Sequence, residues 1–161
     1  MHALPDAGHR HHAALKPRID ALPELADALD APTPDIRARL ADEYRFIVGQ
    51  LVPHMEQAEA TLYPQLERLM QNRHSMTPMR REHQEVRALI RELEVLIERG
   101  LTLGTRLRLR RVLLGLYTIV KIHLGEEQAY IGVLDHNLSP DEQVALAEAL
   151  EHATLREPVT A

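Results

Sequence analysis

The 161-residue chain contains no cysteine and no tryptophan, and its aromatic residues are one phenylalanine and four tyrosines. Without cysteine it cannot form a disulfide framework, a thiolate zinc site or a cysteine-ligated iron–sulfur cluster. Any bound metal must therefore be held by histidine, aspartate, glutamate or tyrosine. The sequence has no run of eighteen apolar residues and no signal peptide, so we expect no membrane association and, by default, a cytoplasmic location.

An excess of basic charge is also missing. The formal net charge is −5, which argues against nucleic acid as a partner. The one basic run, Arg106–Arg111, alternates with leucines and indicates a solvated helix face beside a buried one. The length predicts a single domain, residues 1–161, with a sizeable core.

Leucine, alanine, glutamate and arginine dominate, and no strand-like alternation is present, so the composition predicts an all-α fold. Proline, glycine and capping residues mark the expected helix ends. They predict helices at about residues 8–30, 33–72, 77–100, 104–135 and 139–154. Short connections favour an up-down-up-down four-helix bundle, over about residues 9–135, with a short C-terminal fifth helix. Pro17 and Pro23 should bend the first helix, and Pro53 and Pro64 the second.

In a helical projection at about 100° per residue, four histidines, one in each long helix, lie on the apolar stripes of their helices. They are His12, His54, His83 and His123. Glu127, one turn after His123, lies in the middle of its stripe, where a carboxylate is costly unless it is paired or binds a metal. A mixed imidazole–carboxylate set suits iron, manganese or zinc.

Each of these residues also has an ordinary structural interpretation. A lone inward histidine is more often a hydrogen-bonded core residue than a ligand, and Glu127 can pair with an arginine such as Arg87. His11 is an alternative to His12. Four inward histidines in four helices, joined by one buried carboxylate, favour the metal site. Surface positions are predicted for His2, His9, His74, His136 and His152.

Three tyrosines lie near the buried stripes: Tyr44, Tyr63 and Tyr130. For each, a packed ring with a hydrogen-bonded hydroxyl is the default role. Tyr130, which follows His123 on the same helix, is the best candidate for a cofactor-binding phenol or for a hydrogen bond to a metal ligand.

The segments HHAALKPRIDAL, HMEQAEATLYPQLE, MRREHQEVRALI and HLGEEQAY resemble those of the hemerythrin-like, or HHE cation-binding, family. That family has a histidine on the first and third helices, and a histidine followed by a carboxylate on the second and fourth. The resemblance spans about residues 9–135 and implies a four-helix bundle around a non-haem di-iron centre. The ligands that it implies are His12, His54, His83, His123 and Glu127.

Two positions depart from the family pattern. Ala58 stands where the second-helix ligand glutamate is usual, and Glu59 follows it. We expect Glu59 to act as a displaced ligand if the prolines of that helix distort it. Otherwise a bridging carboxylate is missing. In that case either water or Tyr130 takes its place, or the site holds only one metal ion. Met79 stands where oxygen carriers have a second third-helix histidine, which weighs against reversible oxygen carriage.

The resemblance therefore implies a di-iron protein that binds, senses or reacts with dioxygen, nitric oxide or peroxide. One alternative is a storage or sensor module for iron or zinc without catalysis. Another is a helical bundle whose site was lost with the carboxylate at position 58. Iron is the expected cofactor, with zinc and manganese as other candidates, and the sequence identifies no protein partner.

Overall fold

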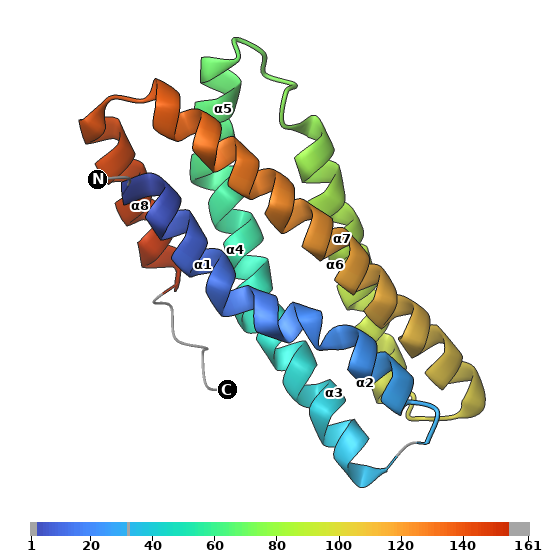
Figure 1. The fold of residues 1–161 in the computed structure, drawn as a ribbon. Helices are drawn as coiled ribbons and strands as arrows, with labels where there is room; N and C mark the ends of the chain where they lie inside the picture. Colours follow the sequence, from blue (N-terminus) through green and yellow to red (C-terminus); the bar gives the residue numbers. More distant parts are fainter. Residues whose placement is uncertain (1–2, 32, 155–161) are drawn as a thin grey trace.

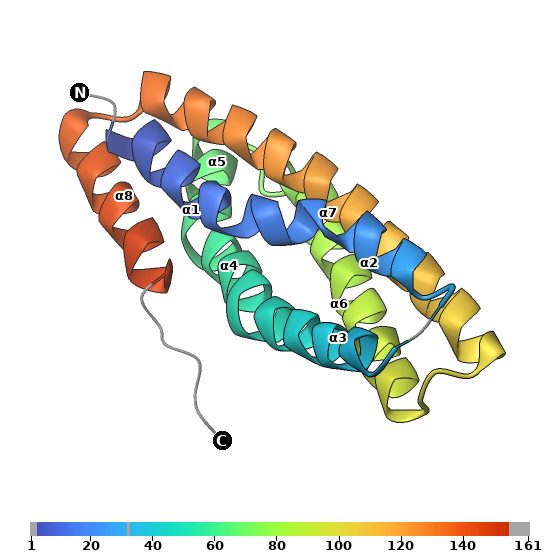
Figure 2. The same cartoon turned by 60° about the horizontal axis from the view of Figure 1, so that its bottom comes forward.

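The computed structural model describes residues 3–31 and 33–154, and within those ranges it contains helices and loops but no strand, which confirms the predicted all-α fold. Four helical rods run side by side, and a further helix lies at one end (Figure 1). The rods are α1 (Ala3–Asp20) with α2 (Leu22–Ala28); α3 (Pro34–Phe46), α4 (Val52–Gln57) and α5 (Tyr63–Leu69); α6 (Thr77–Glu98); and α7 (Leu103–Asn137). The further helix, α8 (Pro140–Thr154), packs alongside α1 (Figure 2).

The first rod begins earlier than the sequence suggests, at Ala3, and it breaks once. Pro17 is accommodated inside α1, and the break falls at Ala21, the N-cap residue of α2. Pro23 occupies the first turn of α2, where its missing N–H leaves no hydrogen bond unmade. Of the two bends expected in the first helix, at Pro17 and Pro23, the one at Pro23 corresponds to the break between α1 and α2.

The second rod is interrupted by two π turns, η1 (Ile47–Leu51) and η2 (Ala58–Leu62). Each lies just before a proline, Pro53 or Pro64. Proline lacks an N–H and crowds the carbonyl four residues earlier, and the wider π turn gives that carbonyl room. The distortions expected at these prolines thus take the form of π turns, one on each side of His54.

The remaining helix ends follow local sequence signals. α6 begins at Thr77, as predicted, and the chain leaves it at Gly100 with a φ of 77°, a left-handed conformation that favours glycine. α8 is preceded by a capping box in which the Glu142 carboxylate accepts from the Ser139 N–H at 2.9 Å.

Two hydrophobic clusters fill the bundle, and every rod contributes to both. On each rod a histidine lies at the boundary between the clusters or within one residue of it. The four histidines are thereby brought to one level of the bundle, with apolar packing on either side. None of the described helices is long and apolar enough to cross a membrane.

Candidate metal centre

Four histidines and one glutamate meet at the boundary between the two clusters. His12 comes from α1, His54 from α4, His83 from α6, and His123 and Glu127 from α7. None is more than 5% exposed. They form two groups of three, His12–His54–Glu127 and His83–His123–Glu127, and within each group the ligand atoms lie within 4.8 Å of one another. The structure thus brings together five of the six residues expected to be metal ligands.

Glu127 belongs to both groups because its two oxygens face in different directions. Oε1 lies 3.2 Å from His12 Nε2 and 3.5 Å from His54 Nε2. Oε2 lies 3.3 Å from His123 Nε2. A carboxylate that presents one oxygen to each of two donor groups can bridge two cations.

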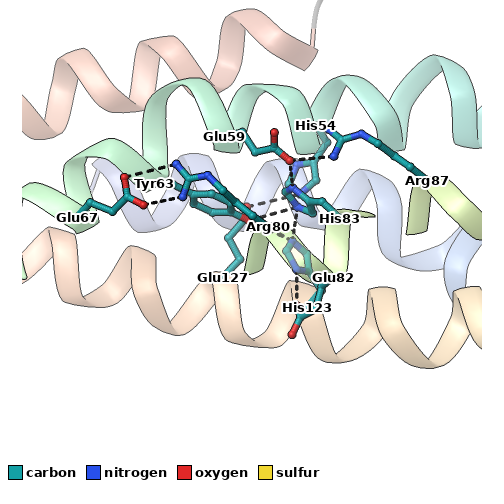
Figure 3. A network of polar contacts seen from close by, with 10 residues as sticks. All are labelled: His54, Glu59, Tyr63, Glu67, Arg80, Glu82, His83, Arg87, His123 and Glu127. Carbon is teal, nitrogen blue, oxygen red and sulfur yellow. Dashed lines mark hydrogen bonds and ion pairs between the residues drawn. The ribbon is translucent and has the colours of Figure 1, made fainter. Parts of the chain in front are cut away.

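The other two imidazoles are oriented by carboxylates behind them (Figure 3). His83 Nδ1 lies 2.6 Å from Glu59 Oε1, and His123 Nδ1 lies 2.8 Å from Glu82 Oε2. Each ring can donate an Nδ1 proton to the carboxylate, and in that neutral tautomer its Nε2 atom carries a lone pair. The two Nε2 atoms face each other at 3.0 Å. Lone pairs that close repel unless a proton or a cation lies between them, so this donor set fits a metal ion.

Among the described residues Glu59 belongs to neither donor group, and its role as a displaced ligand stays a prediction. Its carboxylate lies behind His83 and also accepts a hydrogen bond from Arg87 at 3.0 Å. The reason is that α4 is a regular helix from His54 onward, and the π turn starts only at Ala58. Arg87, suggested as a partner for the buried fourth-helix carboxylate, pairs with Glu59 instead.

The electrostatics of the centre favour a carboxylate at Glu127 and a neutral imidazole at His83. Burial acts to raise the pKa of Glu127, but the surrounding imidazoles, His54 first, hold that pKa well below its usual value. Burial, and then the neighbouring His123, lower the pKa of His83 to about 4, which keeps it in the neutral form that binds metals. Burial also acts to lower the pKa of His123, but Glu127 and Glu82 outweigh it and raise that pKa.

The phenol that reaches the centre is that of Tyr63. Its buried hydroxyl lies 3.2 Å from His83 Nε2, 3.4 Å from Glu127 Oε2 and 3.5 Å from His123 Nε2. Tyr130, the phenol favoured by the sequence, is half-buried and packs against the hydrophobic cluster that includes residues of α8. Helix periodicity places Tyr130 on the correct stripe but does not show which residues it contacts.

The other histidines whose side chains the structure describes do not join the two donor groups. His9, His74 and His136 are exposed, as predicted. His2 and the side chains of His11 and His152 lie outside the described residues.

A cavity of about 440 Å³ lies between α1 and α7, beside the first donor group. His12 forms part of its wall, together with Lys16, Lys121 and Gly125. A small ligand can therefore approach this side of the centre between the two helices.

Comparison with known proteins agrees with this geometry. The model of one protein family, the hemerythrin HHE cation-binding domain, matches residues 5–134. Neither the curated proteins nor the solved structures compared with the chain gave a match. The matched segment covers most of the chain and includes all four histidines of the centre and Glu127. The chain therefore belongs to the hemerythrin HHE cation-binding domain family.

Proposed function

We propose that this is a non-haem di-iron protein that binds, senses or reacts with dioxygen, nitric oxide or peroxide. The observation that carries the proposal is the sharing of Glu127 between two buried donor groups. A shared carboxylate holds two cations close together, and an iron pair supplies redox chemistry and positions at which a small ligand can bind.

The chain's own residues account for the binding and the shielding of such a pair. His12 and His54 would hold one ion and His83 and His123 the other. The two hydrophobic clusters pack above and below the donors and shield them from bulk water on those two sides. The carboxylates behind His83 and His123 fix their ring orientation, so that little reorganisation accompanies binding.

Access to the centre favours a protein that takes up an external ligand. The cavity between α1 and α7 reaches His12, one of the proposed ligands. A site devoted only to holding metal does not require such an opening. The cavity volume, about 440 Å³, is ample for a diatomic molecule or peroxide.

A metal store or sensor without catalysis, holding iron or zinc, is the second candidate. It is favoured by the origin of the ligands, because the donors come from all four rods. Metal binding then ties the rods together, and the stability of the bundle reports on metal occupancy. Iron, zinc and manganese all accept a mixture of imidazole and carboxylate ligands, so metal analysis must decide between them.

The test is metal analysis and absorption spectroscopy of protein purified after growth in iron-rich medium. We expect about two irons per chain and the near-ultraviolet absorption of an oxo-bridged ferric pair, with a spectral change on addition of peroxide or nitric oxide. Zinc alone, or iron whose spectrum does not respond to either molecule, would favour the store or sensor. Protein that binds no metal would contradict both candidates.

A further inference from the structure

The hydroxyl of Tyr63 has more acceptors around it than it can satisfy. Within 3.5 Å lie Nε2 of His83, Nε2 of His123 and Oε2 of Glu127. In the neutral tautomers that donate their Nδ1 protons to the carboxylates, both Nε2 atoms carry lone pairs. A hydroxyl has one proton and can donate to only one of these three atoms. A cation among them would be bound by all three and by the phenol oxygen as well.

The η2 turn brings Tyr63 to this position. Tyr63 lies nine residues after His54, which in a regular helix would put it about 180° away, on the opposite face. Its N–H bonds instead to the carbonyl of Ala58, five residues earlier. The extra residue in this turn leaves Tyr63 near the direction of an eighth residue, about 80° from His54. Ala58 itself is buried and offers no donor atom.

The ring is held in place from two sides (Figure 3). It stacks on His83 with the ring centroids 5.6 Å apart and an interplanar angle of 25°. The Arg80 guanidinium lies 5.4 Å from the centroid of the tyrosine ring, and Arg80 is in turn fixed by Glu67 at 2.6 Å. The phenol oxygen is thus directed at the His83–His123–Glu127 group without any rotamer change.

We propose that the phenol oxygen of Tyr63 is a ligand of the cation held by His83, His123 and Glu127. The ion then has two imidazole nitrogens, a carboxylate oxygen and a phenolate oxygen from the protein, and the tyrosine compensates for the missing donor at Ala58. As the oxygen–metal bond forms, the O–H bond breaks, the proton passes to solvent, and no electron is transferred. This inference rests on the proposed iron centre and makes the two halves of that centre chemically different.

Visible spectroscopy of the full chain loaded with iron in air tests the proposal. A phenolate bound to ferric iron gives a charge-transfer band in the visible, separate from the near-ultraviolet absorption of an oxo-bridged pair. Excitation into that band in resonance Raman spectroscopy should enhance tyrosine ring modes. We expect both signals in the unmodified protein, a measurement that does not depend on how any variant folds.

Tyr63→Phe should abolish the visible band and weaken iron binding at that half of the centre about tenfold or more. Tyr130→Phe makes the same chemical change outside both donor groups and should keep the band and the iron content. Iron-loaded protein without the band, or a band that survives in Tyr63→Phe, would overturn the proposal while leaving the di-iron function intact. Unmodified protein that takes up no iron would instead contradict the proposed function itself.

Discussion

Replacing Glu127 by glutamine tests the shared carboxylate without changing the size of the side chain. Glu127 is 1% exposed; its Oε1 atom faces His12 and His54, and its Oε2 atom faces His123. The amide has one acceptor oxygen and an NH₂ group that cannot bind a cation. In Glu127→Gln, therefore, one donor group loses its oxygen ligand, and both lose the negative charge.

The size of the effect follows from the spacing of the donor atoms. All donors within a group lie within 4.8 Å of one another, so a bound ion lies close to the carboxylate. At an effective dielectric constant of about 20, a pair of unit charges about 4 Å apart is worth about 4 kcal/mol. That energy corresponds to about a thousandfold in affinity. We expect the iron content to fall from about two ions per chain to one or fewer, with loss of the near-ultraviolet absorption.

Metal analysis and absorption spectra, measured after identical iron loading, make the comparison. Glu126→Gln is the matched control, because Glu126 is the preceding residue of the same helix and is exposed. It should retain both the metal and the spectrum. A Glu127→Gln variant with unchanged iron content and an unchanged near-ultraviolet band would refute the assignment of Glu127 as the bridge.

Three further changes have distinct expected outcomes. His54→Ala should lower both the metal content and the melting temperature, because it removes a ligand from a buried site. His74 is exposed, and His74→Ala should change neither quantity. Thermal melts and metal analysis measure both. Glu59→Gln should weaken metal binding about 10- to 100-fold while two ions still bind at saturation, and loss of one ion at saturation would make Glu59 a ligand after all. Gly125→Leu should slow azide binding to the iron-loaded protein in stopped-flow measurements, because it partly fills the cavity beside α1. Gly132 lies on the same helix, and an added Cβ meets nothing within 4 Å there or at Gly125. Gly132→Leu should bind azide at the original rate, and equal rates for the two variants would contradict this route.

Much of the fold and of the site is predictable because the relevant signals are local. Helix periodicity identifies the inward faces that carry the four histidines and Glu127, and proline, glycine and the Ser139–Glu142 capping box identify most helix ends. A buried carboxylate in a leucine stripe is informative by itself, since it needs a partner wherever the helices meet.

The features that the sequence did not predict depend on contacts between helices or on a change of helix type. Glu82 directly precedes His83, yet its carboxylate contacts His123 on another helix. The residue pattern of one helix cannot predict a contact with a different helix. A constant turn per residue would put Tyr63 on the face opposite His54, and the π turn before Pro64 changes that angle. Glu59 was expected to follow a distorted helix, but the distortion begins only after His54 has completed a regular turn.

The most direct test of the central claim is a crystal structure of the iron-loaded protein with anomalous diffraction recorded at the iron edge. We expect two iron peaks, one beside each oxygen of Glu127, the first near His12 and His54 and the second near His83 and His123. A single peak, or peaks outside both donor groups in protein that contains iron, would contradict it.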